Sequence, residues 1–395
     1  MTDTTDAVPI PTAEAGPVPR CERALAPDLA RGAMLLFIAL ANAANFAFAG
    51  QPGIDGTPHG LERVVNFFMI TFVDSRAYPV FAVMFGYGLA QLARRAAAAG
   101  ADPRRILLRR NAWLVVFGAL HATLLYFGDF LGAYGIVGII ATLVLLRRGD
   151  RFHRLVLWLW ALLLGYTFLL AAKLIVNAKS GHAILTNTPN PSLAATSYGH
   201  GVLDRLAEWP VHTATVVPFI FIVWLGIWAA RRHILENPTA HQVLLRRTAL
   251  GCLAVTVLGA LPYALVAAGA LQVDSATRDA MAYLHAVSGE FGGPGYVALF
   301  GLLALKFSTG LRRPATVRAV AALGQRSLSA YLFQSVAWTI VFAPFAMDLG
   351  ATTYRAALAA VAVWTVSVLA AQAMDRRRYR GPAERLLRSL TYGRS

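Results

Sequence analysis

Long apolar segments, separated by short polar ones, recur along the whole chain. Most approach the roughly 20 apolar residues that an α-helix needs to cross a bilayer. Ten can be counted, near 31–50, 77–93, 111–127, 131–146, 155–175, 211–230, 248–270, 288–307, 328–346 and 354–373. The pattern predicts an all-α, polytopic membrane protein with about ten transmembrane helices. Nine or eleven are the alternatives, because the second and eighth segments have weak edges.

Basic residues gather on alternate connections between these segments. One side carries most of the arginines, including the pairs at 94–95, 104–105, 109–110, 147–148, 231–232, 246–247 and 312–313 and the run RRRYR from Arg376. Loops rich in Lys and Arg stay in the cytoplasm, so both termini are predicted to be cytoplasmic. The net charge of +16 then reports topology and could also hold anionic lipid or a phosphorylated cofactor; it does not indicate nucleic acid.

Composition changes at the two ends of the chain. Residues 1–27, rich in Pro, Ala, Thr and acids, are predicted to be a disordered cytosolic tail, and 376–395 a basic cytosolic tail. The stretch 28–375 between them is predicted to be one transmembrane helical domain. Its N-terminal half covers about 28–175 and its C-terminal half about 210–375.

An ionisable pair stands out in the stretch GALHATLLYFGDFLGAYG, from Gly118 to Gly135. A tight turn at FGDFLG would make the third and fourth segments a hairpin, with Asp129 at its outer tip and within reach of water. His121 would lie some 10 Å deeper, where ionisable groups usually face the bundle interior or a wet cavity. The alternative is a neutral His121 bonded to a neighbouring helix, with Asp129 capping the next one. The two can pair only if the helix ends early and the turn folds Asp129 back.

Further polar groups lie in apolar surroundings. Asn42 follows Arg31 by eleven residues, close to three helical turns, so both can face the same side. A buried Asn can bind helices together or polarise a carbonyl. Gln334, in GQRSLSAYLFQS, poses the same choice, and Glu290 precedes FGGPGY, where Pro294 could break the helix.

Several of these motifs together resemble the YeiB-like membrane proteins, whose C-terminal half is the domain of unknown function 418. The motifs are Arg31-Gly32 with Asn42, FAVMFGYGLA at 81–90, LLRRNAWLVVFGALHATLLYFGDFLGAYGIVG, GQRSLSAYLFQS and the ending GPAERLLRSLTYG at 381–393. The resemblance runs from about residue 25 to the end. It implies ten or so helices in a bacterial inner membrane and supplies no substrate.

The first segment is also similar to that of the heparan-α-glucosaminide acetyltransferase group, through Asp28-x-x-Arg31-Gly32 with Asn42. That group takes an acyl group from cytosolic acyl-CoA and delivers it to an acceptor, often a sugar. The similarity implies an active-site role for Asn42 and for a histidine of the following outer loop, where His59 is the candidate. A histidine within the first span, as in the wider set of acyltransferases, is absent here, which shifts the base to His121.

The hypothesis is therefore an acyl-CoA-dependent membrane acyltransferase. His supplies a base and Asn an oxyanion donor, while Arg forks suit the phosphates of the donor, acetyl-CoA or another acyl-CoA. The candidate catalytic residues are His121, Asn42, Asp129 and His59; the candidate cofactor-binding residues are Arg31, Arg109 and Arg110; the candidate substrate-binding residues are Gln334, Tyr331 and Glu290.

Other partners and functions follow from the same pattern. Membrane lipids, a small-molecule, glycan or lipid acceptor and a homodimer are the expected partners, and the nine histidines form no metal cluster. A transporter or flippase is the alternative, and a structural membrane protein the third. We expect His121, Asp129 and Asn42 to line one cavity that opens outward. In that case His121→Ala and Asn42→Ala would abolish function and leave folding nearly intact.

The arginine asymmetry gives a test of topology. A reporter that is active only outside the cell membrane, fused after Ser395, should stay silent because the C-terminus is expected in the cytoplasm. The same reporter should be active in the large outer loop expected at 177–208, within which 202–208 is expected to form a short helix. Activity of the Ser395 fusion would overturn the even number of spans.

Overall fold

The computed structural model describes residues 24–308, 313–350 and 352–393. The regular secondary structure of this part of the chain is helical apart from one pair of two-residue strands, which are antiparallel. The elements are α1 (Leu25–Ala47), β1 (Gly50–Gln51), α2 (Leu61–Phe68), η2 (Met69–Val73), α3 (Ala77–Ala98), α4 (Pro103–Leu124), α5 (Phe130–Ile140), η3 (Ala141–Leu145), α6 (Asp150–Asn177), β2 (Thr188–Pro189), α7 (Pro191–Ala194), α8 (Tyr198–Val216), η4 (Val217–Phe219), α9 (Ile220–Arg231), α10 (Gln242–Ala267), α11 (Ser275–Gly289), α12 (Gly292–Ser308), α13 (Ala315–Gly324), α14 (Ser327–Phe342), α15 (Thr353–Arg376) and α16 (Pro382–Tyr392).

The predicted all-α class is confirmed, and each of the ten apolar segments coincides with a helix. Six helical stretches are long and apolar enough to cross a membrane, and shorter apolar helices accompany them. The six are Leu25–Ala47, Leu61–Ala98, Asp150–Asn177, Tyr198–Arg231, Gln242–Ala267 and Thr353–Arg376. This set fits a helical membrane protein. Ten crossings and cytoplasmic termini stay predictions.

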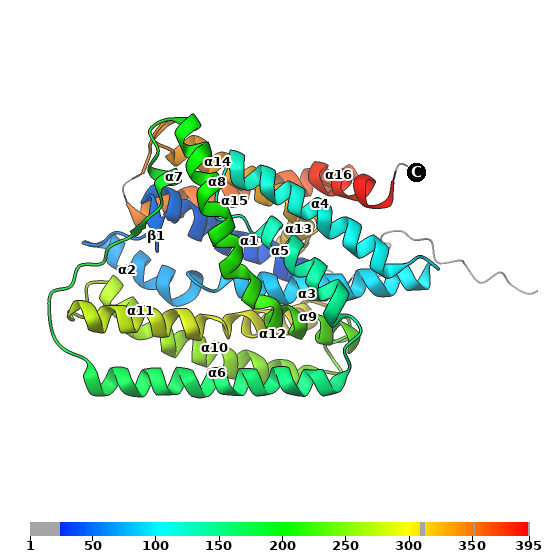
Figure 1. Ribbon diagram of the computed structural model, residues 1–395, viewed down its shortest axis with the longest axis horizontal. Coiled ribbons are helices and arrows are strands. Elements are labelled where there is room, and N and C mark those ends of the chain that lie inside the picture. Colours follow the sequence, from blue (N-terminus) through cyan, green and yellow to red (C-terminus); the bar gives the residue numbers. More distant parts are fainter. Residues whose placement is uncertain (1–23, 309–312, 351, 394–395) are drawn as a thin grey trace, which may run out of the picture.

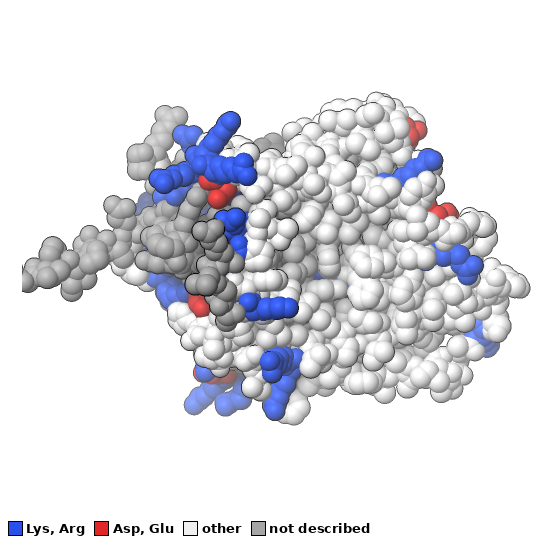
Figure 2. Space-filling view, turned by 180° about the vertical axis from the view of Figure 1, so that it is seen from behind, with Lys and Arg blue, Asp and Glu red and all other residues white. Residues whose placement is uncertain are grey.

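The long helices run in roughly one direction, so the bundle has two ends (Figure 1). We call the end that holds α16 and the α3–α4 loop the basic end, and the end that holds β1 and α2 the distal end. Figure 2 shows Lys and Arg gathered at the basic end on one face, with a broad uncharged band between it and the few charges of the distal end. This distribution matches the predicted segregation of charge.

Local structure departs from the sequence-based expectations at three places. A short helix expected at 202–208 is the start of α8, which continues through Pro210. The break expected near Pro294 falls before it, between α11 and α12, because a proline fits the first turn of a helix without losing a hydrogen bond. Most of the predicted 1–27 tail lies outside the described residues, and α1 already begins at Leu25.

Glycines let helices approach at backbone distance. A Cβ built on Gly226 of α9 would lie 1.9 Å from the carbonyl oxygen of Val83 in α3, and one on Gly86 would lie 2.0 Å from that of Val223. Small residues at helix contacts are typical of membrane bundles, where close packing replaces the hydrophobic effect between helices. Gly86 and Gly226, each packed against the backbone of the other helix, therefore fix the position of α3 against α9.

The C-terminal helix α16 is tied to the start of α14. Glu384 accepts hydrogen bonds from the backbone N–H of Leu328 at 2.8 Å and of Ser329 at 3.1 Å, and from the Ser329 hydroxyl. These N–H groups belong to the first turn of α14. The N–H groups of a first turn have no acceptors within their own helix, and this end of the helix attracts negative charge. The glutamate of the GPAER motif therefore caps the N-terminus of α14 from the neighbouring helix α16.

The α3–α9 contact can be tested with two glycine substitutions. Gly226→Ala should lower the free energy of unfolding by about 1–3 kcal/mol, because the new methyl group overlaps backbone atoms that cannot move aside. Gly165→Ala, in α6 where nothing lies within 4 Å of the built Cβ, should be neutral or stabilise by about 0.5–1 kcal/mol. Thermal unfolding in detergent measures both. Equal effects would contradict the packing described here.

Candidate functional site

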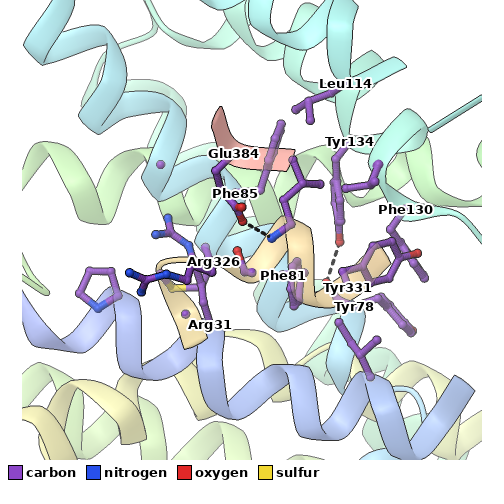
Figure 3. Close-up of a pocket in the computed structure, with 18 of the residues that line it drawn as sticks. Arg31, Tyr78, Phe81, Phe85, Leu114, Phe130, Tyr134, Arg326, Tyr331 and Glu384 are labelled. Carbon is purple, nitrogen blue, oxygen red and sulfur yellow. Dashed lines mark hydrogen bonds between the residues drawn. The ribbon is translucent and has the colours of Figure 1, made fainter. Parts of the chain in front are cut away.

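A cavity of about 1080 Å³ runs between α1, α3, α4, α5, α8, α14 and α16. Its wall includes Asp28 near the start of α1 and Asn45 near its end, so it extends along most of that helix. Figure 3 shows part of it, with Arg31 and Arg326 on one side and the aromatic rings of Tyr78, Phe130 and Tyr134 on the other.

Arginines surround the cavity at the basic end. Some are held by carboxylates, with Arg94 Nη2 2.8 Å from Glu236 Oε1 and Arg326 Nη2 3.1 Å from Asp375 Oδ1. Four carboxylates share the wall with eight guanidinium groups, Asp28, Glu236 and Glu384 at this end and Asp74 in the distal part, so positive charge is in excess at the basic end. The eight are Arg31, Arg94, Arg95, Arg110, Arg326, Arg378, Arg380 and Arg388.

Glu236, in the loop between α9 and α10, remains ionised among these arginines. Burial raises its pKa, but hydrogen bonds from Tyr87, Gln91 and Arg94 outweigh burial and leave the pKa below its ordinary value. The Gln91 and Arg94 bonds measure 2.7 and 2.8 Å. The loop is therefore fastened to α3 at the entrance.

The middle of the cavity is aromatic and the distal part is polar. Rings of the wall stack on one another, with centroid distances of 4.7 Å for Tyr78 and Phe219 and 5.2 Å for Phe85 and Tyr134. The polar groups of the distal part are Asn42, Asn45, Gln51, Asp74, Ser75, His212 and Thr215. A ligand in the cavity thus meets cations at one end, apolar rings in the middle and uncharged donors, a histidine and a carboxylate at the other.

His121 and Asp129 do form a pair. Helix α4 ends at Leu124, and the turn brings Asp129 back so that its Oδ1 lies 2.9 Å from His121 Nδ1. Asp129 also accepts from the N–H groups of Leu131 at 3.1 Å and of Gly132 at 2.6 Å, and so caps α5. The expectation that Asp129 reaches water is wrong, because its exposed fraction is 0%. Bonds from the turn replace the water.

A third residue completes this network. His121 Nε2 lies 2.8 Å from Ser335 Oγ of α14. A carboxylate can only accept, so Nδ1 donates to Asp129. The Ser335 hydroxyl, the partner of Nε2, also donates to the backbone carbonyl of Tyr331 at 3.3 Å. The order Ser–His–Asp is that of a hydrolase triad, but Ser335 is 1% and His121 3% exposed. Neither is among the described residues that line the cavity.

The expected shared cavity is therefore only partly realised. Asn42 lines the cavity, whereas His121 is separated from it by a packed ring: Tyr331 lies in the wall, with its centroid 4.9 Å from that of His121. The position of His121 corresponds to the alternative considered from the sequence, in which the histidine is bonded to a neighbouring helix and Asp129 is a cap.

The remaining candidates fall into three groups. Arg31, Arg110 and Tyr331 line the cavity. Arg109 and His59 are exposed on the surface and do not belong to the described wall. The other two, Gln334 and Glu290, lie behind it. Gln334 Nε2 donates to the carbonyl of Leu35 at 3.3 Å, and Glu290 accepts from Tyr78 at 3.0 Å.

Sequence reasoning missed a second histidine–carboxylate pair. His285 Nε2 of α11 lies 2.9 Å from Oδ2 of Asp74, which is part of the cavity wall. The two residues are 211 positions apart, so no local spacing connects them. The one available signal was the polar triplet Asp74-Ser75-Arg76 between two apolar segments. Over the residues that the structure describes, no group of three or more His, Cys, Asp or Glu could hold a metal ion.

Comparisons with known proteins place the chain among bacterial proteins without an assigned activity. Residues 229–394 match the family described as protein of unknown function, DUF418. The chain is 25% identical to the uncharacterized protein YxaH of Bacillus subtilis (strain 168), over 92% of this chain and 93% of the relative. It is also 25% identical to the uncharacterized protein YeiB of Escherichia coli (strain K12), over 94% and 96%. The resemblance to YeiB-like proteins is confirmed, whereas these comparisons do not show the similarity to acetyltransferases.

Enclosure of His121 predicts unequal effects of two substitutions. His121→Ala removes the buried side chain that bonds to both Asp129 and Ser335, although each keeps a backbone partner, so stability should fall by about 1–3 kcal/mol. Asn42→Ala truncates a side chain of the cavity wall and should change stability by less than about 0.5 kcal/mol. Thermal unfolding of both variants provides the comparison. If His121→Ala unfolds at the wild-type temperature, the network does not exist as described.

Proposed function

We propose that this chain, which matches the DUF418 family over residues 229–394 and is similar to YeiB, is a membrane-embedded acyltransferase. It would move an acyl group from cytosolic acyl-CoA to an acceptor at or across the membrane. The observation that carries the proposal is the single cavity with arginines at one end, aromatic rings in the middle and polar groups at the other. An acyl-CoA has the same order of chemistry: phosphates, an extended thiol arm and a thioester.

The donor end of the reaction suits the basic end of the cavity. Phosphates bind best to guanidinium forks. Arg31 and Arg110, which the sequence predicted as cofactor-binding residues, both line the cavity. Asn42 lies eleven residues after Arg31 on α1, which is about 16 Å along the axis. A thioester that reaches Asn42 would meet an amide N–H able to stabilise the oxyanion of the tetrahedral intermediate. The acceptor would enter from the distal end.

The base of this reaction is less directly supported than the donor site. His121 is correctly oriented by Asp129, but it lies behind Tyr331, so it could act only when that ring moves. His59 is on the surface and would need to enter the cavity. Because neither histidine belongs to the described cavity wall, the reaction requires a different proton acceptor.

A transporter or flippase is favoured by two other features of the same cavity. The cavity extends along most of α1. The helical stretch that forms one of its walls is interrupted between η2 and α3, and a second interruption, between α11 and α12, lies behind that wall. Interrupted helices at the middle of a bundle often form transporter sites. Binding of the donor distinguishes the two functions.

Acetyl-CoA should raise the thermal unfolding temperature of the purified protein, because a ligand that binds the folded state stabilises it by mass action. Arg110→Gln should weaken the shift, since a charge-assisted bond of about 1.5–3 kcal/mol corresponds to roughly 10–100-fold in affinity. Its neighbour Arg109, exposed outside the cavity wall, provides the control: Arg109→Gln should keep the full shift.

The opposite result is equally informative. No shift of the wild-type protein at millimolar concentrations, across several acyl chains, would contradict the acyltransferase proposal and favour transport. A full shift in Arg110→Gln would move the donor site away from this cavity. Transfer of labelled acetyl groups to a lipid or glycan acceptor in reconstituted vesicles would then measure the reaction itself.

A further inference from the structure

Two helix interruptions meet beside the cavity: Asp74–Arg76, of which Asp74 and Ser75 belong to the wall, and Glu290–Phe291, which lies behind it. We call this junction the double break. Glycines bring its two sides together, since a Cβ on Gly289 would lie 2.7 Å from the carbonyl oxygen of Ser75. Ser75 itself has φ of 58°, a left-handed conformation that costs about 1–2 kcal/mol for a residue with a side chain. Such strain collects at functional sites.

The first carboxylate of the double break is fully compensated. Asp74 Oδ2 accepts from the Ser75 hydroxyl at 3.1 Å and lies 2.9 Å from His285 Nε2. Arg76 Nη1 lies 3.0 Å from His285 Nδ1 and 3.1 Å from Nε2. A carboxylate can only accept and a guanidinium can only donate, so a proton on Nε2 allows the ring to donate to Asp74 and to accept from Arg76 at Nδ1. The negative charge of Asp74 therefore has two donors and a nearby cation.

The second carboxylate, Glu290, is poorly compensated. Its Oε1 accepts from the Tyr78 hydroxyl at 3.0 Å. Its Oε2 is buried and has no hydrogen-bond partner within the described residues. No Lys, Arg or His among those residues forms an ion pair with Glu290 either. A buried charge without a partner is strongly unfavourable. Of the two carboxylates, Glu290 therefore gains more from binding a proton.

Tyr78 connects Glu290 with the cavity. Its ring belongs to the wall and stacks on Phe219, and Figure 3 shows it beside Phe130 and Tyr331. Its backbone carbonyl is held by the Tyr134 hydroxyl at 2.7 Å, which fixes the position of the ring. Because the Tyr78 hydroxyl donates to Glu290, its oxygen retains lone pairs that can accept a proton from a group in the cavity.

We propose that Tyr78 and Glu290 form the proton-accepting site of this cavity, with Tyr78 as the catalytic residue and Glu290 as the store of the proton. In the acyl transfer on which this role rests, the acceptor O–H gives its proton to the Tyr78 oxygen while Tyr78 passes its own to Glu290. The acceptor oxygen bonds to the acyl carbon, the C–S bond of the thioester breaks, and the leaving thiolate takes the proton back through the same route. The other titratable or charged groups that face this site are Asp74, Arg76, His285 and Tyr134.

The inference can be tested without any assumption about the substrate. Infrared difference spectra of the reconstituted full chain, recorded between acidic and alkaline buffers, detect a carboxyl group that gains a proton. Glu290→Gln, which can still bond to Tyr78, should remove one carboxyl band, and Tyr78→Phe should shift it because the hydrogen bond to Oε1 is lost. Glu62→Gln is the matched control. Glu62 is as deeply buried but accepts from two backbone N–H groups, those of Thr353 and Tyr354, and its replacement should leave the band unchanged.

The outcomes separate this inference from the proposed function. A spectrum of Glu290→Gln identical to that of the wild type, with unfolding temperature unchanged, overturns the proton site. If Glu290→Gln loses the band but the wild type transfers no acyl group from any donor, the proton site stands and the acyltransferase proposal falls. If transfer occurs and Glu290→Gln keeps the wild-type rate and pH profile, the proton role falls and the acyltransferase stands. Loss of turnover with acetyl-CoA binding retained is the expected result.

Discussion

Polar groups inside this bundle depend on partners from the chain itself, and the carboxylate of Asp129 is the one on which the most structure depends. It caps α5 through two backbone N–H groups and orients His121, which in turn binds Ser335 of α14. Three helices are joined by one side chain with no exposed surface. The close approach of α4 and α5 follows the same constraint, since a Cβ on Gly118 would lie 2.4 Å from Asp129 Oδ2.

The cavity is possible because other polar groups are satisfied elsewhere. Glu384 caps α14, and Glu236 binds Arg94 and so holds the α9–α10 loop on α3. The acids of the basic end are thus engaged and are fewer than its arginines. At the other side of the cavity, the double break supplies a carboxylate and a tyrosine from interrupted helices. Charge is thus arranged along the cavity by helix ends and interruptions, while the regular parts of the helices provide its apolar rings.

Periodicity and length were sufficient to predict the helices, because an apolar helix in a membrane is specified locally. Arg31 and Asn42 could be placed on one face of α1 from their spacing alone, and both line the cavity. The structure also resolved the alternatives for His121, but no spacing could have done so, because its partner Ser335 lies 214 residues away. Asp74 and His285 were missed for the same reason. Contacts between distant helices depend on packing, which the sequence of one chain does not display.

The cap that Glu384 provides to α14 has a consequence for the order in which the protein is assembled. During synthesis, α14 emerges before α16, and until then the first N–H groups of α14 lack the carboxylate that satisfies them in the complete fold. The arginines Arg378, Arg380 and Arg388, which border the cavity, arrive at the same late stage. The bundle can therefore be inserted with its basic entrance unfinished, and the entrance gains its last three arginines and one of its borders only after α16 has been synthesised.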